Sequence, residues 1–173
     1  MEIDHTPPNT EIEVEISDGQ RFLRVDHADL SALVRRTLTA QGVDAASISI
    51  ALVDDPTIHA INRRHLAHDW PTDVISFVLS EPDEPVLSGE LVVSAEMAAT
   101  TAREAGADPN AELALYVVHG LLHLCGLDDR DESDAAIMRR REAEILEAHG
   151  LTNPFPLVGP TADAGREDVR CDR

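Results

Sequence analysis

The chain has 173 residues, 43% of them hydrophobic, which is enough for one globular domain with a packed core. Its formal net charge is −19, so the surface as a whole is expected to repel RNA. Every Lys or Arg position is arginine, and a local groove of arginines remains compatible with RNA binding. Two cysteines form no disulfide framework, and the sequence shows no signal peptide or membrane-spanning stretch. We therefore expect a reduced, cytoplasmic protein without a membrane partner.

Alternating or continuous apolar residues predict the strands. Alternation predicts strands over residues 12–16 and 48–52, and a short strand over 22–25. The run at 74–79 is too continuous for a strand with one exposed side, so we expect it to be buried on both faces. A further strand is expected over 89–94.

Apolar spacing, caps and terminal glycines predict five helices, over about residues 29–41, 56–66, 95–105, 109–125 and 133–149. Asp26 or Asp29 is expected to cap the first, Asp55 the second, and Asp131 or Ser133 the last. The expected buried side of the second helix consists of Ile58, Ile61 and His65. The expected apolar stripe of the last helix consists of Ile137, Met138, Ile145 and Leu146.

This order predicts a single α+β domain, a mixed sheet of about four strands packed by about five helices. The domain is expected to span residues 11–150. Residues 1–10, which contain two prolines, are expected to form a flexible arm, and residues 151–173 have too few apolar residues to pack and are expected to be a disordered tail.

A candidate metal site lies at the end of the fourth helix, in the run VVHGLLHLCGLDDRD from Val117. His119 and His123 are four residues apart, on one helical face. Gly126 favours the end of the helix, and the following turn can bring the carboxylate of Asp128 or Asp129 back over the histidines. Two nitrogens, one oxygen and a fourth position left to water are typical of a catalytic zinc.

Other residues suggest weaker hypotheses. His59, His65 and His68 invite a second metal site, but capping, packing or substrate contact explains them equally simply. Zinc peptidases with two histidines at this spacing carry a glutamate directly after the first one, and here that residue is Gly120, which argues against peptide hydrolysis. Cys125 is turned away from the histidine face and is interpreted as a core thiol.

Three segments resemble one known family. HGLLHLCGLDD, from His119, resembles the signature HGxLHLxGYDH of the YbeY family, bacterial metal-dependent single-strand endoribonucleases linked to ribosomal RNA maturation and small-subunit quality control. INRRHLAHDWPTDVISF (residues 61–77) and GELVVS (residues 89–94) resemble further segments of that family, in the expected order. The resemblance covers roughly residues 48–146 and implies the same α+β fold.

The resemblance also assigns roles to residues. The three metal ligands of the family are His-x3-His-x5-His, which places them on His119, His123 and Asp129, with a carboxylate where the family has its third histidine. The substrate-facing arginine of the family aligns with Leu66, and Arg63 or Arg64, about one turn earlier, is the candidate replacement.

The sequence therefore predicts a hydrolase with one zinc ion per chain that cleaves single-stranded, ribosomal RNA through metal-activated water. Its implied partner is the small ribosomal subunit or an assembly factor. Two alternatives stay open. One is a non-catalytic ribosome-assembly factor with a structural metal, which the loss of the family arginine favours, and the other is a zinc peptidase.

Overall fold

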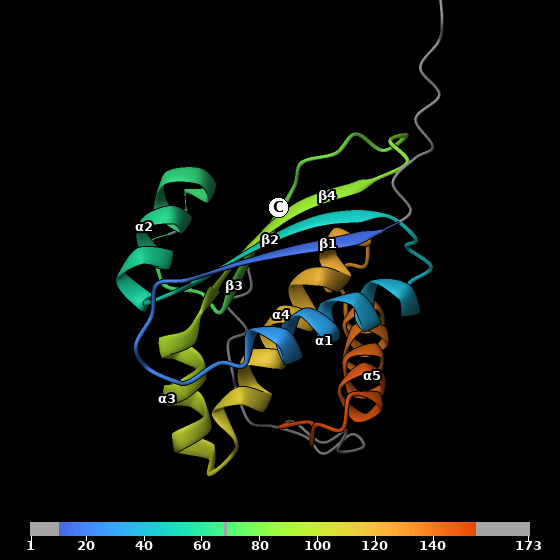
Figure 1. The fold of residues 1–173 in the computed structure, drawn as a ribbon. Coiled ribbons are helices and arrows are strands. Elements are labelled where there is room, and N and C mark those ends of the chain that lie inside the picture. Colours follow the sequence, from blue (N-terminus) through green and yellow to red (C-terminus); the bar gives the residue numbers. More distant parts are fainter. Residues whose placement is uncertain (1–10, 68, 155–173) are drawn as a thin grey trace, which may run out of the picture.

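Four strands form one mixed sheet in the order β1-β2-β4-β3, as seen in the computed structural model (Figure 1). The structure describes residues 11–67 and 69–154; the predicted arm at 1–10, His68 and the predicted tail from residue 155 lie outside these ranges. The strands are β1 (Ile12–Asp18), β2 (Ala46–Val53), β3 (Val74–Val78) and β4 (Leu87–Ser94). The helices are α1 (His27–Ala40), α2 (Asp55–Leu66), α3 (Ala95–Ala105), α4 (Pro109–Leu124) and α5 (Glu132–Ala148). The element order and the α+β class agree with the prediction.

The sheet separates a large core from a small one. β1 and β4 pair with β2 in parallel, and β3 pairs antiparallel with β4 at the edge. Because side chains alternate along a strand, Val74, Leu91 and Val93 face the main core with α1, α4 and α5, whereas Ile75 and Val92 face the other side. There they pack with Ile58 of α2 and with partly buried Val53, Ile61, Leu66 and Phe77. Figure 1 shows α2 across the sheet from α4 and α5.

Aspartate side chains begin most of the helices. Asp26 caps α1 and Asp131 caps α5, each accepting backbone N–H groups of the first turn. The cap of α2 is Asp54, one residue before the predicted Asp55. Asp55 instead accepts a 2.6 Å hydrogen bond from the Ser94 hydroxyl.

Three sequence predictions about strands and burial were wrong. Residues 22–25 form no strand, because the Gln20 side chain accepts from the N–H groups of Phe22 and Leu23 and donates to the Leu23 carbonyl, which ties the segment into a turn. The 74–79 run is buried on both faces only at its start, since β3 is an edge strand and Leu79 is 63% exposed. On α2, His65 is exposed, while Asn62 is buried and donates to the Trp70 carbonyl.

The last helix also differs from its prediction. Ile137 is 57% exposed and does not belong to the buried stripe, whose members are Met138, Glu142, Ile145 and Leu146. Gly150 turns the chain back with a φ of 81°, and the N–H of Leu151 donates to the Leu146 carbonyl. Leu151, the first residue of the predicted tail, packs against the core. Among the described residues, no helix is long and apolar enough to cross a bilayer.

Candidate metal centre

The candidate site is carried by α4, the most buried helix of the fold. Its residues contact the sheet on one side and α1, α3 and α5 on the others. Because α4 is surrounded in this way, it can be apolar on almost every face. The helix ends at Cys125, and Gly126, with a φ of 92°, reverses the chain. The N–H of Leu127 then donates to the Leu122 carbonyl, which brings the following aspartates back beside the end of the helix.

Three side chains converge at this turn. His119 Nε2 and His123 Nε2 are 2.9 Å apart, Asp129 Oδ2 lies 3.7 Å from the first of these nitrogens, and Asp129 Oδ1 lies 3.7 Å from the second. The three donor atoms lie within 4.8 Å of one another. His119 is 3% exposed, whereas the His123 side chain is 23% exposed. The cluster is therefore closed on the His119 side and accessible at His123.

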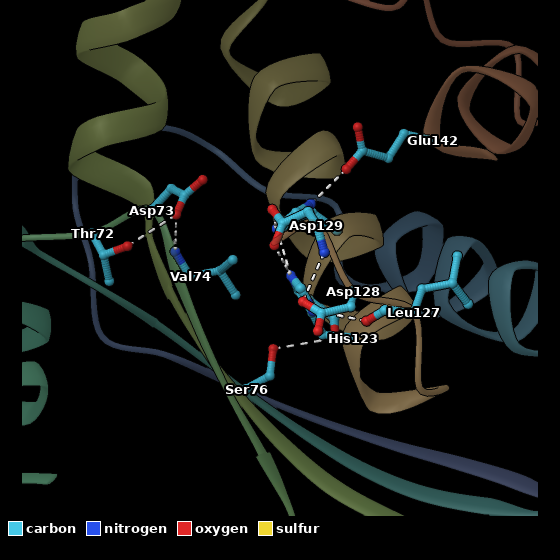
Figure 2. Close-up of polar contacts among 11 residues, drawn as sticks. Thr72, Asp73, Val74, Ser76, His123, Leu127, Asp128, Asp129 and Glu142 are labelled. Atoms are coloured by element: carbon cyan, nitrogen blue, oxygen red, sulfur yellow. Dashed lines mark hydrogen bonds and ion pairs between the residues drawn. The ribbon is translucent and has the colours of Figure 1, made fainter. Parts of the chain in front are cut away.

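The outer ring nitrogens fix the direction of both imidazoles. His119 Nδ1 lies 2.6 Å from Glu142 Oε1, and His123 Nδ1 lies 3.0 Å from the Leu127 carbonyl oxygen (Figure 2). A carboxylate and a carbonyl accept hydrogen bonds, so these contacts favour a proton on each Nδ1, which directs Nε2 of each ring inward. Burial, and then the neighbouring His119, lower the pKa of His123, which favours its neutral, ligand-competent form.

This donor set fits a metal ion. Two lone pairs that face each other beside a carboxylate repel unless a cation lies among them. Zinc bonds of about 2.0–2.2 Å in tetrahedral geometry separate neighbouring donor atoms by roughly 3.3–3.5 Å. The observed separations of 2.9 and 3.7 Å lie on either side of that range. The three side chains can hold one ion with small adjustments.

Of the two candidate aspartates, Asp129 is the one grouped with the histidines. Asp128 Oδ1 accepts from the N–H of Asp129 at 2.8 Å, and its Oδ2 forms an ion pair with Arg130 at 3.1 Å. Asp128 thus stabilises the turn that presents its neighbour.

The sheet packs closely against the face of α4 next to the two histidines. The Ser76 hydroxyl donates to the Gly120 carbonyl at 3.2 Å, and a Cβ at Gly120 would lie 2.9 Å from both Leu91 and Val74. Asp73 accepts from the N–H of Val74 and the Thr72 hydroxyl, so it stabilises the entry to β3 (Figure 2). The position that carries the general base in zinc peptidases therefore points into packed protein and has no room for a glutamate.

Residues 15–150 match the sequence profile of a family described as Endoribonuclease YbeY. The chain belongs to the YbeY endoribonuclease family. Its activity is accordingly that of a hydrolytic nuclease, with RNA as the class of substrate.

Relatives in the YbeY family match most of the chain. The Endoribonuclease YbeY of Rhodopirellula baltica is 40% identical over 164 residues, which cover 94% of this chain and 83% of the relative. That of Carboxydothermus hydrogenoformans is 41% identical over 140 residues, covering 79% and 97%. The solution structure of TM1509 from Thermotoga maritima superposes with a TM-score of 0.54 at 24% identity, covering 78% of this chain and 90% of that one, which shows a shared fold.

The structure does not group the candidate arginines with the YbeY metal cluster. Arg63 and Arg64 are exposed in the last turn of α2, which packs on the sheet face opposite α4. The second metal hypothesis receives no support in the described ranges, where His119, His123 and Asp129 form the one group of potential ligands found. His59 instead pairs with Asp69 at 3.0 Å, and the His65 ring contacts Phe77 edge-on.

Sequence reasoning missed Glu142 and the carbonyl of Leu127. On α5, Arg141 pairs with exposed Glu144, whereas Glu142 is buried against His119. The burial of Glu142 could have been predicted, because it follows Met138 by four residues and so falls on the apolar face of the helix. Burial, meanwhile, raises the pKa of Cys125 to about 11, which agrees with its interpretation as a packed thiol.

Proposed function

We propose that this YbeY-family protein is a zinc-dependent endoribonuclease for single-stranded RNA that acts in the cytoplasm, in ribosomal RNA maturation and small-subunit quality control. One zinc ion per chain is held by His119, His123 and Asp129. The proposal rests on the convergence of these three donor groups in a chain of an endoribonuclease family. The ribosomal role and its partners, the small subunit or its assembly factors, are supported by the resemblance of three sequence segments to that family.

One side of the candidate metal site is accessible to water and substrate. Two nitrogens and one oxygen complete three positions of a tetrahedral ion, and a zinc ion there supplies a water of pKa about 7 and stabilises charge on a phosphodiester. His119 is buried, so water and RNA reach the cluster past the more exposed His123. Asp129 adds a negative charge where the family pattern has a histidine, which lowers the Lewis acidity of the ion.

We further propose that Arg63 or Arg64 contacts a phosphate of the bound RNA, away from the histidine cluster. Both are exposed in the last turn of α2, and the loop after that turn leads to Thr72 and Asp73 at the start of the strand that packs on α4. A guanidinium binds phosphate oxygens in a bidentate manner, which suits this task. Replacing the responsible arginine by alanine is expected to raise the KM for RNA and to leave zinc affinity unchanged.

Cleavage of a labelled single-stranded RNA by zinc-loaded protein tests the function. The wild type is expected to cleave, and His123→Ala, checked for native circular dichroism, is expected to lose at least about a hundredfold in rate because it removes a ligand. Arg103→Ala, at an exposed position on α3, serves as the matched control for purification and should cleave like the wild type.

The same assay separates the alternatives. Zinc binding by a folded wild type that cleaves no single-stranded RNA would replace the enzymatic proposal by the assembly-factor hypothesis. Cleavage that survives in His123→Ala would show that this cluster is not the catalytic centre.

A further inference from the structure

Glu142 is a buried acid in contact with the candidate metal centre from a different helix. Its side chain is 4% exposed, and Oε1 lies 2.6 Å from Nδ1 of His119, which is itself 3% exposed (Figure 2). Burying a carboxylate is costly unless it is hydrogen-bonded to a charged or strongly polar partner. A 2.6 Å contact between two groups shielded from water is therefore a strong and specific interaction.

The packing of α5 holds this carboxylate in place. Met138, Ile145 and Leu146 lie four residues before, three after and four after Glu142, so all four share one helical face. The three apolar side chains are buried in the main core between α4 and the rest of the domain. Glu142 thus occupies a core position on a rigid element, and the helix carries its oxygen to His119.

The two histidines are oriented by different means. His123 donates from Nδ1 to the carbonyl of Leu127, which the turn after α4 supplies whatever the side chain is. The His119 ring is instead oriented by the side-chain carboxylate of Glu142. A substitution can therefore disturb the orientation of His119 selectively.

We propose that Glu142 is the positioning residue of the metal centre. It holds the proton of His119 on Nδ1, keeps the Nε2 lone pair directed at the ion, and increases the basicity of the ring through its negative charge. This inference rests on the proposed function, because it takes His119 as a metal ligand.

Zinc affinity, measured by competition with a chromogenic chelator, tests this role without RNA. Glu142→Gln keeps an oxygen that can accept from Nδ1 and removes the charge, and we expect about tenfold weaker zinc binding; Glu142→Met removes the acceptor and should approach a hundredfold. Glu144→Gln on the exposed face of α5 is the matched control and should bind like the wild type. Equal affinity in the wild type and both Glu142 variants would overturn the proposal but leave the metal site in place. Absence of zinc binding by the wild type would instead overturn the proposed function.

A second measurement covers the case in which the variants do not fold. Nitrogen-15 chemical shifts of the imidazole rings in zinc-free wild-type protein report which nitrogen carries the proton. We expect His119 to be protonated on Nδ1. Protonation on Nε2 would overturn the positioning role.

Discussion

At the scale of single residues, Gly120 sets how closely the metal-bearing helix approaches the sheet. It lies between the two histidines in sequence and on the neighbouring face of α4, where an added Cβ would come within 2.9 Å of Leu91 and Val74 and 3.1 Å of the Ser76 hydroxyl. Ser76 donates to its carbonyl in the same contact. The absence of a side chain thus allows β3 and α4 to pack directly, next to the cluster of His119, His123 and Asp129.

We predict that Gly120→Ala destabilises the fold by about 1–3 kcal/mol, because it overpacks a core contact that cannot open without moving β3. Urea denaturation followed by circular dichroism measures the change. Gly19→Ala is the control, since a Cβ there meets only the Leu52 carbonyl oxygen at 3.8 Å, and it should lie within about 0.5 kcal/mol of the wild type. An unchanged unfolding midpoint for Gly120→Ala would contradict the packing argument.

The histidines of the candidate metal centre were predictable from local spacing, but the residues around them were not. The i, i+4 pair His119 and His123 places two imidazoles on one face in any helix. Choosing Asp129 over Asp128 by residues alone was not possible, because either fits the turn. Glu142 is distant in sequence, and only the packing of α5 on α4 brings it to His119.

At the scale of the element, α5 shows where periodicity misleads. Ile137 and Met138 are adjacent apolar residues at the same predicted face, yet Ile137 is 57% exposed and Met138 is fully buried. Glu142 takes the core position that an apolar residue would usually hold, so the true stripe is rotated away from Ile137.

We predict that Met138→Ala lowers the free energy of unfolding by about 2–5 kcal/mol, because it leaves a cavity between α5 and the core. Ile137→Ala, one residue away, should change it by less than about 0.5 kcal/mol. Chemical denaturation of both variants measures the difference. Equal destabilisation by the two substitutions would mean that α5 packs with the face predicted from sequence.

The remaining differences at this scale have local causes. The N-cap of α2 is one residue earlier than predicted because two aspartates are adjacent there. Asp54 caps the helix, whereas Asp55 accepts a hydrogen bond from Ser94. The edge position of β3 follows from strand order, which a single sequence does not contain. The turn at Gln20 depends on a side-chain amide that bonds three backbone groups, a pattern that apolar alternation overlooks.

At the scale of the whole molecule, the candidate metal centre joins residues from separate elements of the fold. His119 and His123 come from α4, Asp129 from the turn after it, and Glu142 from α5. A net charge of −19 also means that folding brings many negative charges together, and a cation bound at this site would partly offset their repulsion.

We predict that zinc raises the stability of the folded chain by about 2.7 kcal/mol when its free concentration is a hundred times the dissociation constant. Thermal unfolding with and without zinc measures the shift. His123→Ala should show little response to zinc. A similar rise in that variant would place the stabilising ion elsewhere.

The zinc content of purified protein tests the central claim most directly. Plasma mass spectrometry on protein prepared without a histidine tag or chelator should find close to one zinc per chain in the wild type and in Asp128→Ala, and much less in Asp129→Ala and His123→Ala. A wild type without metal, or equal zinc in all four proteins, would contradict the assignment of His119, His123 and Asp129 as the metal centre.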